Sequence, residues 1–128
     1  VALEIKSMII GIAETIEQNV NLIRVTGGGA KSDFWIQIMA DVFNKQMETI
    51  KCPEATSLGA AMCAAVGHGV YKDLKEAAAN MVQVDKRYEP IPKNVEIYAE
   101  LFDLYNRFYE ATTTDFFPGL NKFQNERV

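Results

Sequence analysis

The sequence predicts a single α/β domain in which a short sheet is packed by several helices, and two observations carry this expectation. A run of β-favouring residues, 22–25, leads into three glycines and then into an apolar pattern of helical period. A second strand-like run, 46–52, is followed by another helical pattern that starts at Pro53. With 128 residues, 48% of them hydrophobic, the chain is long enough for one core but short for two.

In the first part of the chain, periodicity places a helix on each side of the first strand. Residues 3–18 have the pattern of an amphipathic helix, with Ile5, Met8, Ile9, Ile12 and Ile16 on one face. The nearly continuous hydrophobicity of residues 22–25 predicts a central strand covered on both faces. After the glycines, Ser32 or Asp33 is expected to cap a helix that runs to Asn44.

Small residues dominate the helix predicted from Pro53 to Gly67, namely Ala55, Ser57, Gly59, Ala60, Ala61, Cys63, Ala64 and Ala65. Because glycine and serine have poor helix propensity, this composition predicts close approach to a neighbouring sheet or helix. His68 lies between two glycines and is expected to be an exposed capping residue. The two cysteines, Cys52 and Cys63, form no metal or disulfide motif and are expected to be small buried packing residues.

The last part of the chain is predicted to hold two further helices. Asp73 is expected to cap a short helix that ends at Met81. Prolines 90 and 92 predict that residues 83–92 form an extended crossing segment outside the interior of a sheet. Asn94 should begin a long helix whose stripe of Tyr98, Leu101, Phe102, Tyr105, Phe108 and Tyr109 docks on the rest of the fold. Residues 112–128 are expected to fray after an aromatic pair.

Composition excludes several classes of partner. The formal net charge is −4, with acidic residues scattered along the chain and no basic run, so neither nucleic acid nor an anionic membrane is an expected partner. No signal peptide and no apolar run of membrane-spanning length are present, and the expected location is cytoplasmic. Because the first residue is Val1 and a helical pattern is already under way there, we expect the chain to be a piece of a longer protein.

The glycine turn is the strongest candidate for a binding site. A strand, a tight glycine turn and a helix N-terminus together present backbone N–H groups and partial positive charge to an anion, as the phosphates of a nucleotide require. The plain alternative, a turn that only connects strand and helix, stays open. A dinucleotide fingerprint is excluded because Ser32 stands where its third glycine belongs, and a Walker loop is excluded because Ala30 and Val25 occupy its glycine positions.

Residues 24–32, Arg-Val-Thr-Gly-Gly-Gly-Ala-Lys-Ser, followed by residues 35–43, Trp-Ile-Gln-Ile-Met-Ala-Asp-Val-Phe, resemble the C-terminal nucleotide-binding domain of the FGGY carbohydrate kinases. The resemblance continues through residues 54–62, Glu-Ala-Thr-Ser-Leu-Gly-Ala-Ala-Met, and into the terminal aromatic helix. It therefore covers nearly the whole chain. It implies an actin-like, ribonuclease-H-like architecture of two domains with ATP in the cleft between them, of which residues 1–128 form the last part of the second domain and the N-terminal domain is absent.

The resemblance also implies which residues contact an adenine nucleotide, ATP or ADP. Gly28, Gly29 and Ala30 would lie against the adenosine and the inner phosphates, and Asp33 would approach the adenine unless it only caps the helix. Gly27 and Ser32 are secondary candidates. For Lys31 two alternatives stay open, a contact with phosphate or a side chain that points to solvent. Ser57, Leu58 and Gly59 would pack behind the nucleotide.

The implied reaction is transfer of the γ-phosphoryl group of ATP to a sugar or polyol hydroxyl, with magnesium shielding charge. The family's catalytic aspartate lies upstream of this chain and its sugar site lies mainly in the absent domain, so no catalytic residue and no metal ligand is assigned here. The fragment is expected to be inactive alone, and the sugar is not identified. The alternative is a stand-alone binding or scaffold module whose glycine turn is structural and whose aromatic helix docks a partner. A homodimer is compatible with either interpretation.

Overall fold

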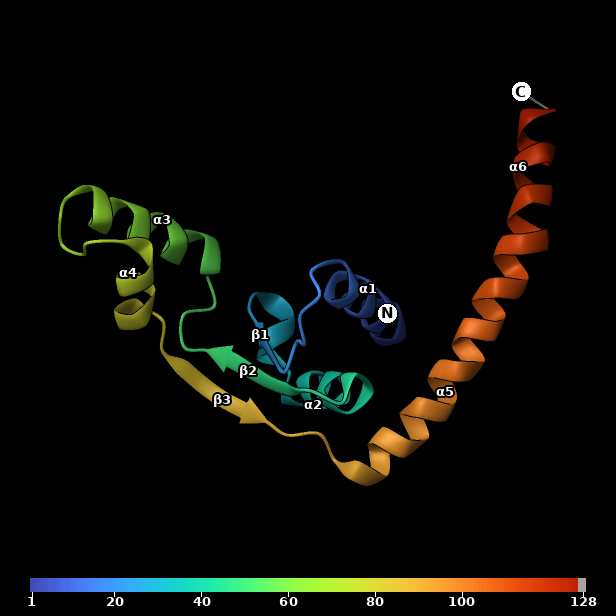
Figure 1. Ribbon diagram of the computed structural model, residues 1–128, viewed down its shortest axis with the longest axis horizontal. Coiled ribbons are helices and arrows are strands. Elements are labelled where there is room, and N and C mark those ends of the chain that lie inside the picture. The colour runs from blue at the N-terminus through green and yellow to red at the C-terminus, as the bar shows by residue number, and fades with distance from the viewer. Residues whose placement is uncertain (127–128) are drawn as a thin grey trace.

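The computed structural model describes residues 1–126 of the chain (Figure 1). Its elements in order are α1 (Ala2–Thr15), β1 (Leu22–Val25), the 3-10 turn η1 (Gly28–Lys31), α2 (Asp33–Phe43), β2 (Gln46–Ile50), α3 (Ala55–Gly67), α4 (Leu74–Met81), β3 (Val84–Tyr88), α5 (Pro92–Ala111), the π-helical turn η2 (Thr112–Phe116) and α6 (Phe117–Asn125). The predicted α/β class is confirmed. The first helix is shorter than predicted because it ends at a cap on Ile16.

The sheet has the strand order β1-β2-β3 within the described residues. β1 and β2 are parallel, with Leu22 opposite Gln46, while β2 and β3 are antiparallel, with Met47 opposite Tyr88. The prediction that residues 22–25 form the central strand is therefore wrong for the described sheet, in which β2 holds that position. The sequence pattern was misleading because β2 contains Glu48, which makes a central strand look polar. Glu48 is nevertheless buried, and its charge is compensated by Arg24 and Arg87.

The segment 83–92 agrees with its prediction in part. Val84–Tyr88 is extended and lies at an edge of the described sheet, outside its interior, but it pairs with β2 as a regular strand and does not merely cross the fold. Both prolines lie beyond the end of β3, where no ladder N–H is required of them. Pro92 instead occupies the first position of α5, where its missing N–H costs nothing, so this helix begins before Asn94.

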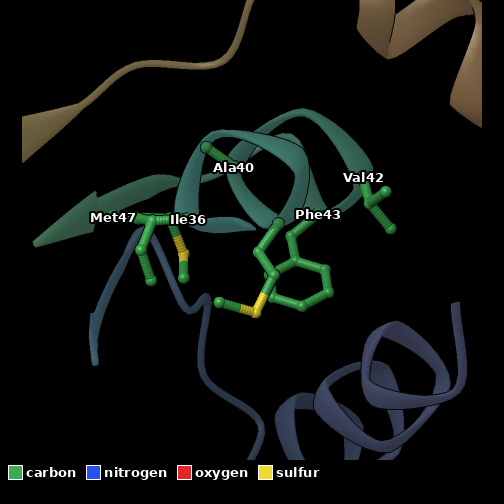
Figure 2. Close-up of a cluster of buried hydrophobic side chains, with 6 residues drawn as sticks. Ile36, Ala40, Val42, Phe43 and Met47 are labelled. Atoms are coloured by element: carbon green, nitrogen blue, oxygen red, sulfur yellow. The ribbon is translucent and has the colours of Figure 1, made fainter. Parts of the chain in front are cut away.

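The core of the molecule is built on α2 (Figure 2). Its buried side chains, together with Met47 of β2, form one cluster: Ile36, Met39, Ala40, Val42, Phe43 and Met47. Apolar residues of α1, β1, β3 and α5 pack around this cluster. Ser32 caps the helix by accepting a hydrogen bond from the Trp35 N–H at 3.3 Å, and Asn44 ends it in a left-handed conformation. The helix predicted after the glycines is thus confirmed, and it is the element on which the others assemble.

A buried carboxylate ties α5 to α2. Asp41, only 2% exposed, accepts hydrogen bonds from the Ile91 N–H at 2.8 Å and from the side-chain amides of Asn94 at 2.7 Å and Gln37 at 2.9 Å. Gln37 also donates to the Glu89 carbonyl at 2.9 Å. Because Ile91 is the N-cap residue of α5, Asp41 fixes the point at which the long helix starts. Asp41 is therefore a buried structural residue.

The small-residue helix α3 packs against α4, and the two project together from one end of the sheet (Figure 1). None of its residues is buried within the described chain. Cys63 is exposed and Cys52 is half-buried, so the prediction of two buried cysteines is wrong. Among the described residues, the close approach predicted for α3 is chiefly to α4, in which Ala77 is fully buried.

Helix α5 leads away from the sheet and continues through η2 into α6 (Figure 1). The prediction that the tail frays after residues 116 and 117 is wrong as far as residue 125, because both lie within helical segments. The hydroxyls of Thr112, Thr113 and Thr114 each donate to carbonyls of the preceding turn. Residues 127–128, which belonged to the same prediction, lie outside the described residues. No helix of the described chain is long and apolar enough to cross a membrane.

The aromatic stripe of α5 docks only in part. Tyr98 packs on the core, Lys6 of α1 lies over the Phe102 ring at 4.5 Å, and Tyr105 donates a hydrogen bond to Glu4 of α1. Beyond these contacts, Phe108 and Tyr109 are exposed. The predicted docking is therefore confirmed for Tyr98, Phe102 and Tyr105, and the other residues of the stripe, including Leu101, are exposed.

We expect Asp41→Ala to lower the free energy of unfolding by about 1–3 kcal/mol, because it removes the buried acceptor of the hydrogen bonds from Ile91, Asn94 and Gln37. Asp41→Asn, which keeps one acceptor oxygen, should cost less. Denaturant unfolding measures both variants. Asp103→Ala, at an exposed aspartate of α5, is the control and should change stability by no more than about 0.5 kcal/mol. Equal costs for Asp41→Ala and Asp103→Ala would contradict the anchoring role.

Candidate functional site

The glycine turn follows the end of β1 and is shaped by one backbone conformation. Gly27 has φ +82° and ψ −163°, a region that only glycine enters without strain. Its N–H donates to the Pro53 carbonyl at 3.3 Å, which joins the turn to the segment that precedes α3. The chain then closes into η1, where the Ala30 N–H donates to the Gly27 carbonyl at 3.2 Å and the Ser32 N–H to the Gly29 carbonyl at 3.4 Å.

Two amides of this turn are left without acceptors. The N–H groups of Gly28 and Gly29 open the 3-10 turn and have no hydrogen-bond partner among residues 1–126. A Cβ at Gly28 would meet nothing within 4 Å, whereas one at Gly29 would contact the Trp35 ring at 3.7 Å. The backbone at Gly28 is therefore open to the approach of a ligand, and its amide is available to an anion.

A cleft of ≈ 310 Å³ lies beside the turn. It is lined by Thr26, Gly27, Ala30, Lys31, Asp33, Thr49, Ile50, Lys51, Pro53, Asp85 and Lys86. Most of these residues follow or end the parallel strands β1 and β2, and the crevice outside the carboxyl ends of parallel strands is where α/β sheets bind ligands. Three lysines against two aspartates give the lining an excess of positive charge.

The side chain of Asp33, at the start of α2, is held by two residues of β3, Lys86 and Tyr88. Lys86 Nζ lies 2.8 and 2.7 Å from its two carboxylate oxygens, and the Tyr88 hydroxyl donates to Oδ1 at 2.8 Å. The hydrogen bond from Lys86, followed by that from Tyr88, lowers the pKa of the Asp33 carboxyl, and the same bond to Asp33 raises the pKa of Lys86. Burial first, and the hydrogen bond to Asp33 second, raises the pKa of Tyr88.

A second carboxylate, Glu48, supports the cleft from within the sheet. It is 2% exposed and accepts from Arg24 Nη2 and Arg87 Nε, each at 2.7 Å, so one charge on β2 joins β1 and β3. The hydrogen bond from Arg24 is the largest cause that lowers the pKa of the Glu48 carboxyl, Arg87 adds to it, and together they outweigh the opposing effect of burial. The next residue of the strand, Thr49, lines the cleft.

The structure places the predicted residues in two groups. Gly27, Ala30 and Asp33 line the cleft, while Gly28 and Gly29 offer the free amides of the turn. Ser32 uses its hydroxyl to cap α2.

Residues of β2 and β3 at the cleft were missed by the sequence analysis, chiefly Thr49, Lys51 and Lys86, because nothing in the local pattern tells that these strands end beside the glycine turn. Ser57, Leu58 and Gly59 do not line the cleft, whereas Pro53, just before their helix, does.

Comparisons with known proteins show the family to which the chain belongs. Residues 1–68 match the family model for the C-terminal domain of the FGGY family of carbohydrate kinases. A xylulose kinase of Staphylococcus epidermidis is 39% identical over 92 residues, which are 72% of this chain and 18% of that protein, and a xylulose kinase of Bacillus subtilis is 32% identical over 130 residues, 94% of this chain and 26% of that protein.

Among solved structures, ligand-bound xylulose kinase from Lactobacillus acidophilus superposes with a TM-score of 0.69 at 36% identity, over 74% of this chain and 19% of that one. The sheet and its helices are thus part of the actin-like ATPase fold. The chain belongs to the FGGY family of carbohydrate kinases. It spans about a quarter or less of the length of the curated relatives named above.

Magnesium is the metal that such a kinase family implies, and Mg²⁺ is usually held by one or two carboxylates together with substrate phosphates. Asp33 and Asp85 are the carboxylates of the cleft, but Asp33 is already engaged by Lys86 and Tyr88. No group of three or more His, Cys, Asp or Glu residues within 1–126 could hold a metal ion. The described residues offer no ready set of metal ligands, and we assign no magnesium ligand to this chain.

We expect Gly27→Ala to lower the free energy of unfolding by about 1–3 kcal/mol, because a Cβ is strained at this φ and ψ. Thermal or denaturant unfolding measures the loss. Gly28→Ala is the matched control, since its φ is not positive and the added methyl meets open space. If the two variants were equally stable, the special conformation assigned to Gly27 would be refuted.

The Glu48 carboxyl should make stability fall in acid. Its pKa in the folded state lies below the ordinary value of 4.5, so its contribution is present above that pH and is lost as the pH falls through the folded pKa. Urea unfolding between pH 7 and pH 3 measures this. We expect Glu48→Gln to be less stable than wild type at pH 7 and the difference to shrink toward pH 3. A constant difference, or one equal to that of the exposed-residue control Glu96→Gln, would count against the prediction.

Proposed function

We propose that the chain is the C-terminal part of the second, nucleotide-binding domain of a two-domain carbohydrate kinase and that its cleft binds part of an adenine nucleotide, ATP or ADP. The observation that carries the proposal is the cleft of ≈ 310 Å³ beside the free amides of Gly28 and Gly29. A polyanion is favoured there by the backbone donors and by the lysines of the lining. The membership of the chain in a carbohydrate kinase family supports the same ligand.

Each candidate residue has a distinct part in this proposal. Gly28 and Gly29 donate their amides to phosphate oxygens, and Gly27 supplies the bend that aims them. Ala30 lets the ligand lie close to the turn, Asp33 faces the nucleoside end, and Ser32 keeps the helix N-terminus in place through its cap.

In the whole protein the reaction is ATP-dependent phosphorylation of a sugar or polyol hydroxyl, with Mg²⁺ supplying charge shielding from ligands outside this chain. Xylulose is our first choice of substrate, because the relatives reported above are xylulose kinases. The catalytic base and most sugar contacts lie in the remainder of the protein, so residues 1–128 alone are inactive. A cytoplasmic location is part of the proposal and rests on the sequence features given above. A homodimer is compatible with the proposal.

We expect Gly28→Val to weaken ADP binding to the full-length protein about 10- to 100-fold. The side chain would stand between the ligand and the amide, and a hydrogen bond to a charged group contributes about 1.5–3 kcal/mol. Isothermal titration calorimetry measures the Kd. Gly11→Val, at an exposed glycine of α1, provides the control for the substitution itself. Unchanged ADP affinity in a folded Gly28→Val protein would refute the assigned site.

The second candidate is a binding or scaffold module, and one observation favours it. An apolar groove of ≈ 590 Å³ lies between α1 and α5, lined by Leu3, Leu101, Leu104, Tyr105, Arg107 and Phe108. Under the kinase proposal this groove is covered by other parts of the full-length protein. Phosphorylation of a sugar panel by that protein separates the two, since a scaffold module transfers no phosphate.

A further inference from the structure

The carboxylate of Asp33 is held in one orientation by two residues of a strand that is distant in sequence. Lys86 bonds both of its oxygens, at 2.8 and 2.7 Å, and the Tyr88 hydroxyl bonds Oδ1 at 2.8 Å. Oδ1 therefore accepts two hydrogen bonds and Oδ2 accepts one. Since each carboxylate oxygen has two lone pairs, Oδ2 keeps one acceptor position for a ligand.

This arrangement contributes little to stability. The side chains of Lys86 and Asp33 are 51% and 61% exposed, and ion pairs between side chains this exposed contribute little because water screens them. Tyr88 is different, because its ring is half-buried against the core cluster and its hydroxyl is carried to Asp33 by a fixed scaffold. Lys86 and Tyr88 thus orient a carboxylate at the cleft, and the ion pair of Lys86 with Asp33 adds little to the stability of the fold.

The position of Asp33 within the cleft indicates which part of a ligand it meets. A carboxylate repels phosphate, and the donors that attract phosphate are the free amides of Gly28 and Gly29 and the lysines Lys31 and Lys51. A neutral, donor-bearing part of the ligand therefore falls beside Asp33. Among nucleotides, the exocyclic amino group of adenine is such a donor, whereas hypoxanthine presents an oxygen at the same position.

We propose that Lys86 and Tyr88 are positioning residues that fix the Asp33 carboxylate as an acceptor for the amino group of a bound purine. The inference rests on the nucleotide site proposed above and adds to it a source of base specificity. Both residues lie outside the stretch 1–68 that matches the family model, so that match assigns them no role. Lys86 acts through Asp33 and does not contact phosphate, which is bound by the amides of the glycine turn.

The test compares the Kd of ADP and of IDP, which lacks the amino group, by calorimetry on the full-length protein. Wild type should prefer ADP by about 10-fold or more, as expected for one hydrogen bond to a charged acceptor. In Lys86→Met the preference should fall toward one, through weaker binding of ADP, and in Tyr88→Phe it should fall by a smaller factor. Lys75→Met, at an exposed lysine of α4 away from the cleft, should leave the preference unchanged.

A merely structural role would not move this ratio, and the melting temperature of Lys86→Met should stay within about 3 °C of wild type. The inference is overturned if Lys86→Met weakens ADP and IDP equally, which would place Lys86 on a phosphate, or if wild type does not distinguish the two nucleotides. It is also overturned if wild type distinguishes ADP from 2′-deoxy-ADP instead. Failure of wild type to bind any of the three would refute the proposed function itself.

Discussion

The burial of one face of α2 is the constraint on which the rest of this structure depends. The sheet, α1 and α5 all place apolar side chains against the cluster centred on Ile36, Ala40 and Phe43, as Figure 2 shows for the cluster itself. The helix that fills the core also begins beside the cleft, where Ser32 caps it and Asp33 faces β3. Packing energy in the interior therefore fixes the position of the glycine turn, because the turn joins β1 to the buried helix through η1.

Two buried carboxylates add polar ties between elements that also pack on the apolar core. Asp41 uses neutral donors from the start of α5, and Glu48 uses arginines on β1 and β3. Removing one partner of such a group leaves a buried charge or a buried N–H unsatisfied, which costs more than the bond itself contributes. The sheet is narrow within the described residues, and the two ion pairs of Glu48 join its central strand to both neighbours.

Local pattern predicted the elements of this fold well, and it failed where tertiary context decides. The strand, glycine turn and capped helix were predicted because β propensity, glycine and Ser32 all act within a few residues. The central place of β2 was missed because Glu48 makes the strand look exposed, and its two arginine partners are 24 and 39 residues away. The contribution of Lys86 to the cleft was missed for the same reason, since its partner Asp33 is 53 residues distant. Sequence spacing carries no signal for such pairs.

The choice of cation differs between the interior and the cleft, and the difference follows from the chemistry of the two side chains. The guanidinium of arginine is planar, weakly hydrated and always charged, which suits the permanent pairing of a buried carboxylate such as Glu48. Lysine is a compact, strongly hydrated charge on a flexible stem, and it is found at Asp33, where the pair is open to solvent. The sheet is therefore joined by charges that stay in place, while the cleft holds a carboxylate oriented by one flexible cation and one rigid hydroxyl with an acceptor position to spare.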